Sequence, residues 1–464
     1  MRSIEIGLAV IFLFLYKVDA TLPKCAEFDQ SGMIARELEK DSKALPFQDK
    51  LEQLFNAFEK NDTASVESIY KSLETIRVDD DDDVREKYTE NLIKSVPDRI
   101  KSHGYPAEVH QLVTEDGYKL DLYRIPYGVK SPKTNRSRPA IILVHGFGEC
   151  SNGWIVLGPE NSLAYLLADN DYDVWIFGAR GTEQSRGHVS LNSKQREYWD
   201  FSWHEIAIYD LTACIDYILS ETKMKRLNYV GFSQGTTVLL VLASLRPEYN
   251  DKIIEANLLG PVAYLKGNRN SLFNAIAHYY KPLKRIFQIL RIFKITIDNK
   301  FLVKITEIAC KRTAHSTPFA CKLVLSIFGS TQINCTSLPA IFINTPAGVS
   351  VRQGIHYIQL IRDGGFRQFD YEDKKINQKI YGSITPPDYN LTRITVPINI
   401  FHSKDDTTAS FENVIQLKSV LPNLKSTYLV PVADFIHVDF TYSRYVRKIL
   451  NGRLIETINS ANRK

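Results

Sequence analysis

A short pattern in the middle of the chain constrains the fold more than any other feature. Residues 231–235 read Gly-Phe-Ser-Gln-Gly, which fits the Gly-x-Ser-x-Gly pattern of a strand-turn-helix that carries a reactive serine. The apolar run 227–230 predicts a buried strand before it, and residues 236–245 predict a helix after it. Such a turn holds the Ser233 hydroxyl clear of the sheet. The alternative is an ordinary tight turn in which Ser233 caps a helix.

Strand and helix patterns alternate on both sides of this motif. We predict a hairpin of 109–113 with 119–124, strands over 140–144, 173–177, 253–259, 396–401 and 426–430, and helices over 206–219 and from residue 441. This alternation predicts an α/β fold whose mostly parallel central sheet carries helices on both faces. Residues 262–385 break the alternation with long helical patterns, which indicates an inserted helical cap.

The chain of 464 residues is too long for one small core, and we divide it into five parts. Residues 1–20 predict a signal peptide, because Arg2 precedes the apolar run 6–16 and a small-residue cleavage site follows. Residues 21–95 predict a helical and acidic extension. The α/β core is expected over 96–261 and 386–464, with the cap over 262–385 between them.

Other features agree with a secretory route. Four Asn-x-Ser/Thr sequons predict glycosylation at Asn61, Asn135, Asn334 and Asn390. No apolar run after the signal peptide is long enough to span a bilayer, so we expect no transmembrane segment. The six cysteines contain no Cys-x-x-Cys pair, which argues against a zinc site. We therefore expect a secreted protein, with the lysosome as the alternative because both destinations use the same signals.

A reactive serine needs a histidine to take its proton and a carboxylate to orient that histidine. In this topology the order along the chain is serine, acid, histidine. Of the ten histidines, only His437 lies beyond the acidic pair Asp405 and Asp406. We predict Ser233, His437 and one of these two aspartates as the catalytic set, and we interpret the competing His402 as a strand residue.

When a serine nucleophile attacks a carbonyl group, the developing oxyanion needs two backbone N–H donors. One should come from Gln234, directly after the serine. The other should come from the loop after the strand 140–144, where Phe147 is the expected donor and His145 is expected to hold the loop. This chemistry needs no metal and no organic cofactor.

Together with further motifs, these residues resemble the acid lipase family, which includes gastric lipase and lysosomal acid lipase. The likeness runs from about residue 104 to residue 448. Its markers are Gly-Tyr-Pro at 104–106, Thr-Glu-Asp-Gly-Tyr at 114–118, His-Gly at 145–146, Asp-Val-Trp at 173–175, Ser-Gln-Gly-Thr-Thr at 233–237 and Leu-Gly-Pro-Val-Ala at 259–263. The resemblance implies an α/β-hydrolase fold with a mobile helical cap or lid. It also implies hydrolysis of triacylglycerols or cholesteryl esters, with Ser233 as nucleophile, His437 as base and Gln234 as an oxyanion donor.

The chain departs from the family pattern in several places. Phe232 stands where the family usually has histidine, and we expect its side chain to point away from the reaction. Aligning the chain with the family segment that carries the catalytic acid places that acid at Asp406. A shift of the alignment by one residue would place it at Asp405. The cap disulfide of the family maps to Cys310 and Cys321, with slightly wider spacing. The extension 21–95 has no recognised counterpart.

Positive charge is concentrated in the insert. Residues 261–335 hold 12 Lys and Arg against Asp298 and Glu307, a net charge of +10, whereas the whole chain carries +5. The insert is either a solvated helical face or a cap that approaches a lipid surface. Nucleic acid binding is not expected, because no recognisable module accompanies the charge. Together with the resemblance to the acid lipase family, these features predict a serine lipase for lipid esters at a lipid–water interface. The alternatives are a carboxylesterase for small soluble esters and a catalytically silent lipid-binding protein.

Overall fold

The computed structural model describes residues 94–131, 137–295, 303, 330, 332–343 and 345–463. The predicted signal peptide and the predicted extension up to residue 93 lie outside the described residues. The same is true of two predicted glycosylation sites, Asn61 and Asn135, and of the predicted disulfide between Cys310 and Cys321.

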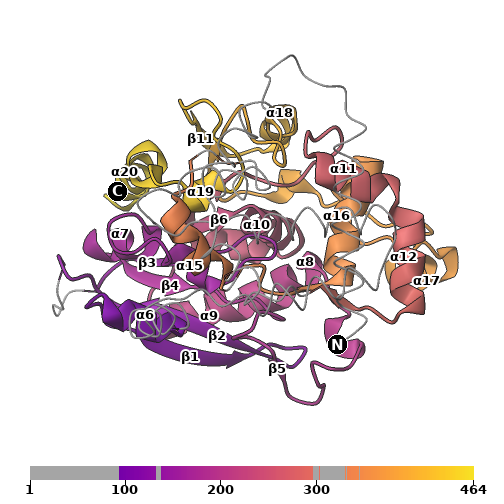
Figure 1. The fold of residues 1–464 in the computed structure, drawn as a ribbon, viewed down its shortest axis with the longest axis horizontal. Helices are drawn as coiled ribbons and strands as arrows, with labels where there is room; N and C mark the ends of the chain where they lie inside the picture. Colours follow the sequence, from indigo (N-terminus) through magenta and orange to yellow (C-terminus); the bar gives the residue numbers. More distant parts are fainter. Residues whose placement is uncertain are drawn as a thin grey trace, which may run out of the picture. The chain divides into compact units, whose positions relative to one another are not determined.

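One large sheet lies at the centre of the described residues (Figure 1). Its strands in spatial order are β1 (Glu108–Val113), β2 (Tyr118–Ile125), β4 (Asp173–Ile176), β3 (Ala140–Val144), β6 (Leu227–Phe232), β7 (Ile253–Leu259), β10 (Ile398–His402) and β11 (Leu424–Leu429), with β5 (Gly187–His188) paired to β2. From β4 to β11 every neighbouring pair is parallel, and only the pairs made by β2 are antiparallel. The predicted mostly parallel sheet is confirmed, with strand ends within two residues of the expected ones.

The sequence of the central strands explains their position. All five residues of β3 are apolar and buried, and every residue of β4 and β6 is buried as well. Continuous apolar runs of this kind suit parallel strands that are covered on both faces. β1 at the sheet edge instead alternates between buried or half-buried and exposed side chains, as a strand with one solvated face does.

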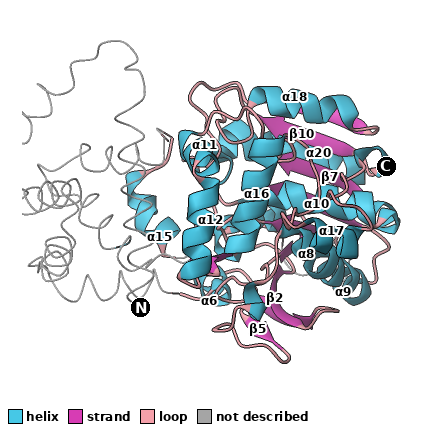
Figure 2. Ribbon diagram, turned by 90° about the vertical axis from the view of Figure 1, so that its right-hand side faces the viewer, coloured by secondary structure: helices cyan, strands magenta, loops and turns pink. Residues whose placement is uncertain are grey.

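Helices cover both faces of the sheet, and two separate hydrophobic clusters fill the layers. One cluster contains residues of α9 (Thr212–Thr222) and α10 (Gln234–Leu245), on the side seen in Figure 2. The other contains residues of α7 (Leu163–Asp169) and α20 (Gly452–Asn462). The remaining helices of the core are α6 (Val96–Ser102), α8 (Trp203–Glu205), α18 (Phe411–Val420) and α19 (Asp439–Tyr442), with short 3-10 turns η1 (Ser151–Trp154), η2 (Glu197–Trp199), η4 (Pro247–Lys252) and η6 (Leu391–Arg393).

Two predicted helices differ in detail. The helix expected over 206–219 begins with a π-helical segment, η3 (Ile206–Leu211), and becomes α-helical at α9. The C-terminal helix expected from residue 441 is broken: α19 ends at Tyr442, and η7 (Arg447–Asn451) leads into α20. A π-helical turn adds one residue to a helical turn, and the hydrophobic spacing of the sequence does not reveal it.

The predicted cap falls between β7 and β10, where the described residues form helices and contribute no strand to the central sheet. The described elements are α11 (Ser271–His278), α12 (Tyr280–Ile289), η5 (Cys335–Ser337), α15 (Leu338–Phe342), α16 (Val351–Asp363) and α17 (Lys374–Tyr381), with a two-stranded pair of β8 (Lys294–Ile295) and β9 (Val349–Ser350). α11 packs against α16 and α12 (Figure 2). The exact boundaries of the cap, 262 and 385, stay predictions.

Candidate active site

Ser233 lies at the sharp turn between β6 and α10. Its φ is +51°, a backbone conformation that costs a non-glycine residue about 1–3 kcal/mol. The Ser233 N–H donates to the carbonyl of Leu259 on β7, at 3.0 Å, which holds the turn in place. A Cβ atom at Gly235 would lie 2.2 Å from the carbonyl oxygen of Val144, so only glycine lets α10 start this close to β3.

Two side chains from late in the sequence meet Ser233 at the carboxyl ends of the strands. His437 follows β11, and its Nε2 lies 2.7 Å from the Oγ of Ser233. The Nδ1 of His437 lies 2.7 Å from the Oδ2 of Asp406, which follows β10. Because an ionised carboxylate can only accept, Nδ1 carries the proton and Nε2 accepts from the serine hydroxyl. The structure therefore brings together Ser233, His437 and Asp406.

The two candidate aspartates have different partners. Asp406 is fully buried, and its second oxygen, Oδ1, accepts the backbone N–H groups of Thr408 and Ala409 at 2.9 and 2.8 Å. Asp405 is directed elsewhere and accepts the backbone N–H of Asp434. These hydrogen bonds agree with the alignment to the family, which favoured Asp406 as the catalytic acid. His402 lies on β10, as the sequence indicated, and none of its hydrogen bonds reaches Ser233.

The loop after β3 is held by His145. The Ala179 N–H donates to Nε2 of His145 at 3.2 Å, so Nδ1 carries the proton and donates to the Gly146 carbonyl at 2.9 Å. Burial lowers the pKa of His145 to about 4, which keeps the ring neutral. Since a trans peptide is planar, fixing the Gly146 carbonyl also fixes the opposite direction of the Phe147 N–H. His145 thus has the structural role predicted for it.

Helix α16 of the predicted cap covers this side of the site. The side chain of Gln353 donates to the side-chain oxygen of Gln234, the residue after Ser233. The ring of Phe147 packs edge-on against Tyr357, with ring centroids 5.5 Å apart. The two predicted oxyanion donors therefore belong to residues whose side chains both contact one cap helix.

The expectation that Phe232 points away from the site needs correction. Its ring centroid lies 5.0 Å from that of the His437 imidazole and 6.3 Å from that of the Phe440 ring. The reason is that side chains alternate along a strand: Phe232 leaves the sheet on the face opposite to its neighbours, and the loop after β11 brings His437 across that ring.

Sequence reasoning missed two buried carboxyl groups near the site. Asp439 is fully buried, and it accepts the N–H of Ile436 at 2.8 Å and the hydroxyl of Ser330 at 2.6 Å. Burial raises the pKa of Asp439 to about 6. Glu149 is also buried, in the loop after β3. In the sequence, Asp439 could have been noticed only because it lies two residues after His437, and Glu149 only because it lies beside the expected oxyanion donor Phe147.

The remaining features concern a cysteine, the glycosylation sites, metal binding and membrane spans. Cys214 on α9 is a buried free thiol. Asn334 and Asn390 are exposed, and their glycosylation stays a prediction. Among the described residues, no group of His, Cys, Asp and Glu side chains could hold a metal ion. In the same part of the chain, no helix combines the length and the apolar character that a membrane span requires.

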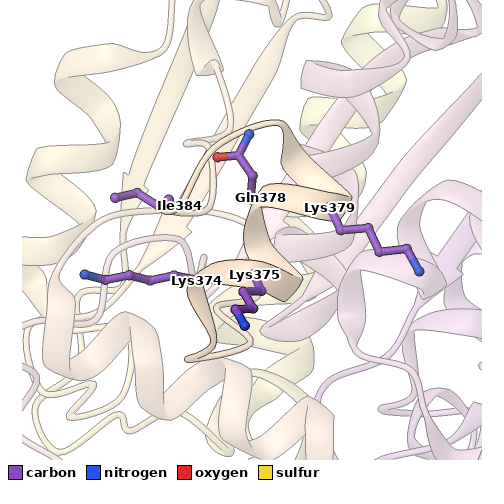
Figure 3. A pocket seen from close by; sticks show the side chains of 5 residues that line it. All are labelled: Lys374, Lys375, Gln378, Lys379 and Ile384. Carbon is purple, nitrogen blue, oxygen red and sulfur yellow. The ribbon is translucent and has the colours of Figure 1, made fainter.

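A separate hollow of about 460 Å³ lies on the outside of α17 (Figure 3). Its lining consists of lysines, one glutamine and one isoleucine: Lys374, Lys375, Lys379, Gln378 and Ile384. None of these residues contacts Ser233, His437 or Asp406 by a hydrogen bond. The hollow is therefore a surface feature of the predicted cap rather than part of the site.

The parallel sheet, the turn that carries Ser233 and the hydrogen-bonded line of Asp406, His437 and Ser233 define an α/β-hydrolase. Two family descriptions match the chain: "Partial alpha/beta-hydrolase lipase region" over residues 96–158 and "alpha/beta hydrolase fold" over residues 139–264.

Three curated proteins illustrate the similarity. The chain is 38% identical to Lipase 3 of Drosophila melanogaster, over 79% of this chain and 93% of that protein. It is 36% identical to gastric triacylglycerol lipase of Bos taurus, over 75% of this chain and 87% of that protein. It is 35% identical to Lipase member K of Homo sapiens, over 74% of this chain and 84% of that protein. The chain belongs to the acid lipase family, as its motifs predicted.

Proposed function

We propose that this chain is a serine lipase that hydrolyses neutral lipid esters, triacylglycerols or cholesteryl esters, through an acyl-enzyme on Ser233. The observation that carries the proposal is the continuous hydrogen-bonded line from Asp406 through His437 to the Ser233 hydroxyl. The names of the relatives, lipases and a gastric triacylglycerol lipase, support a lipid ester as the substrate.

In the proposed mechanism the Oγ of Ser233 attacks the ester carbonyl while its proton passes to Nε2 of His437. Asp406 stabilises the imidazolium that forms. The negative carbonyl oxygen accepts the backbone N–H groups of Phe147 and Gln234. When the tetrahedral intermediate collapses, the ester C–O bond breaks and His437 protonates the leaving alcohol. A water molecule, deprotonated by His437, then attacks the acyl carbonyl carbon. The bond from that carbon to Oγ breaks, His437 returns the proton to the Oγ of Ser233, and the fatty acid leaves.

The surface of α12 supports action at a lipid–water interface. Ile286, Ile289 and the following Leu290 are exposed, and Ile289 exposes 72% of its surface. Lys281 and Arg285 on the same helix are exposed as well. Isoleucines flanked by basic side chains suit an element that inserts apolar atoms into a lipid surface and keeps its charges at the headgroups. In this proposal the cap approaches the lipid and uncovers the site beneath α16.

The predicted signal peptide and sequons support secretion as the location of this activity, with lysosomal delivery as the alternative. Either route exposes the chain to compartments in which disulfides form. The predicted pair Cys310 and Cys321 would then close a loop of the cap.

The proposal is tested by hydrolysis of emulsified triolein and cholesteryl oleate by the purified protein at pH 5 and pH 8. Ser233→Ala is the inactive variant. Ser244→Ala is its matched control, because Ser244 is a buried serine of α10, the helix that follows Ser233, and its hydroxyl donates to the carbonyl of Val241. We expect fatty acid release by the wild type and by Ser244→Ala, and none by Ser233→Ala.

Absence of release from both lipids by folded wild-type protein would refute the lipase. Hydrolysis of a short soluble ester in that case would support the carboxylesterase alternative. Lipid binding that is unchanged in Ser233→Ala, with no hydrolysis of any ester by the wild type, would support the silent lipid-binding alternative.

A further inference from the structure

A buried carboxyl group lies in the loop after β3 and takes no part in the line from Asp406 to Ser233. It belongs to Glu149, which is only 7% exposed. Its Oε2 accepts the Gly146 N–H at 3.0 Å, and its own backbone N–H donates to the Gly146 carbonyl at 3.3 Å. Both backbone groups of Gly146 are therefore held by the same residue.

This double contact matters because Gly146 has no side chain to limit its backbone. Glycine has the greatest conformational freedom of all residues, and its φ and ψ determine how the two peptides on either side are oriented. The contact to the N–H fixes the peptide before Gly146. The contacts to the carbonyl, from Glu149 and His145, fix the peptide after it. The Phe147 N–H belongs to that second peptide, so its direction depends on these bonds and, through the φ and ψ of Gly146, on the contact between the Gly146 N–H and the Glu149 carboxyl group.

The bond to Glu149 also decides which N–H groups remain available. The Gly146 N–H is already donating inside the loop, so it cannot serve a substrate oxygen. The Phe147 N–H does not donate to the carboxyl group that holds its neighbour. Of these two neighbouring donors, the Phe147 N–H is the one left for a substrate oxygen, and the side chain of Glu149 engages the other.

The residues around the Glu149 carboxyl group lie close to the catalytic residue His437. A Cβ at Gly146 would lie 3.1 Å from both the Oε2 of Glu149 and the ring of Phe232, the ring that packs against His437. The hydroxyl of Tyr442 on α19 lies beside Glu149 as well. Burial raises the pKa of Glu149, while the hydrogen bond from the Gly146 N–H opposes that rise. Neutral or ionised, its Oε2 can accept the Gly146 N–H.

We propose that Glu149 is a positioning residue for the oxyanion hole: its carboxyl group holds Gly146 so that the Phe147 N–H points at the oxygen of the reacting ester. This role presupposes the proposed ester hydrolysis at Ser233. It makes a side chain of the loop, rather than the loop backbone alone, responsible for the geometry in which charge is stabilised.

The test compares Glu149→Leu, which removes the acceptor, with Glu149→Gln, whose amide oxygen still accepts the Gly146 N–H. kcat and KM are measured on a soluble short-chain p-nitrophenyl ester, so that lipid adsorption does not enter. Inhibition by an alkyl boronic acid is measured in parallel, because its tetrahedral adduct with serine places a negative oxygen in the oxyanion hole. Glu255→Leu is the control, since Glu255 is a buried carboxylate near the opposite end of β7.

We expect kcat of Glu149→Leu to fall by at least about tenfold, because complete loss of one oxyanion donor costs about 100- to 1,000-fold. KM should stay within about twofold, and boronic acid affinity should fall with kcat. Glu149→Gln should keep kcat within about threefold. Glu255→Leu should keep both kcat and boronic acid affinity.

Two results would overturn the role of Glu149: a leucine variant with wild-type kcat and boronic acid affinity, or a glutamine variant as impaired as the leucine variant. If Glu149→Leu gives little folded protein, the rate constant for labelling Ser233 with a fluorophosphonate still decides, because it reports only on folded molecules. A wild type that neither hydrolyses the ester nor labels at Ser233 would instead refute the proposed function itself.

Discussion

The buried carboxyl group of Asp439 makes the stability of this protein depend on pH in a direction opposite to that of most carboxylates. Asp439 lies two residues after His437, is fully buried, and accepts the hydroxyl of Ser330, a residue of the predicted cap. Burial, the largest cause, raises its pKa from 3.8 to about 6. The perturbation is Asp439→Asn, which removes the titration and keeps a side-chain oxygen that can accept the N–H of Ile436.

The sign follows from which state binds the proton more tightly. The folded carboxyl binds it near pH 6, whereas the unfolded one binds it near pH 3.8, so between these values the folded state holds more protons. The free energy of unfolding therefore rises as the pH falls through 6, and it stops rising below the unfolded pKa. A shift of roughly two units corresponds to about 3 kcal/mol in total, and most of it should develop between about pH 6.5 and pH 4.

The assay is urea unfolding of the wild type and Asp439→Asn at several values between pH 4 and pH 8. Contributions from all other titrating groups are common to the two proteins and cancel in the difference at each pH. We expect the wild type to gain stability relative to the variant as the pH falls, by up to about 3 kcal/mol. A difference that is constant across this range, or that grows as the pH rises, would refute the reasoning.

Three further changes test other parts of the fold and the proposed surface. Gly235→Ala should destabilise the protein by more than about 4 kcal/mol or prevent folding, since its methyl would lie 2.2 Å from the Val144 oxygen; soluble yield and urea midpoint measure this. Arg180→Met should cost about 3–5 kcal/mol in urea unfolding at pH 8 because it leaves the buried Asp210 unpaired, and less at pH 5, where burial favours its protonated form. Ile289→Ser should lower adsorption to a lipid emulsion about tenfold and leave hydrolysis of a soluble ester unchanged, whereas equal loss of both would contradict a surface role.

Much of the fold could be predicted because its signals are local. The residues of β3, Ala-Ile-Ile-Leu-Val, have no polar member, and both their identity and their neighbours predict a buried parallel strand. Ser233 and His437 could be predicted because a short motif and a chain-order rule left few candidates. The choice between Asp405 and Asp406 depended on an alignment that had to be correct to one residue. In the structure, the backbone N–H groups of Thr408 and Ala409 donate to Asp406 and hold its side chain inward.

The remaining features depend on contacts between distant segments, which one sequence does not display. Phe232 lies beside His437 only because a loop 205 positions further along crosses the end of β6. Glu149 lies in a glycine-rich loop, where a glutamate side chain is usually exposed to solvent. It is buried here because Phe232 and Tyr442, which come from distant parts of the sequence, lie close to its carboxyl group. The cap boundaries and the sugar attachment sites stay predictions.

The order in which the strands contribute to the site has a consequence for biosynthesis. The serine comes with β6, the carboxylate with the loop after β10, and the imidazole only after β11, 204 residues beyond the serine. A ribosome delivers the chain from its N-terminus, so for nearly half of translation the nucleophile exists without a base. The catalytic set is therefore complete only after residue 437 has been synthesised and the loop that follows β11 has packed against Ser233.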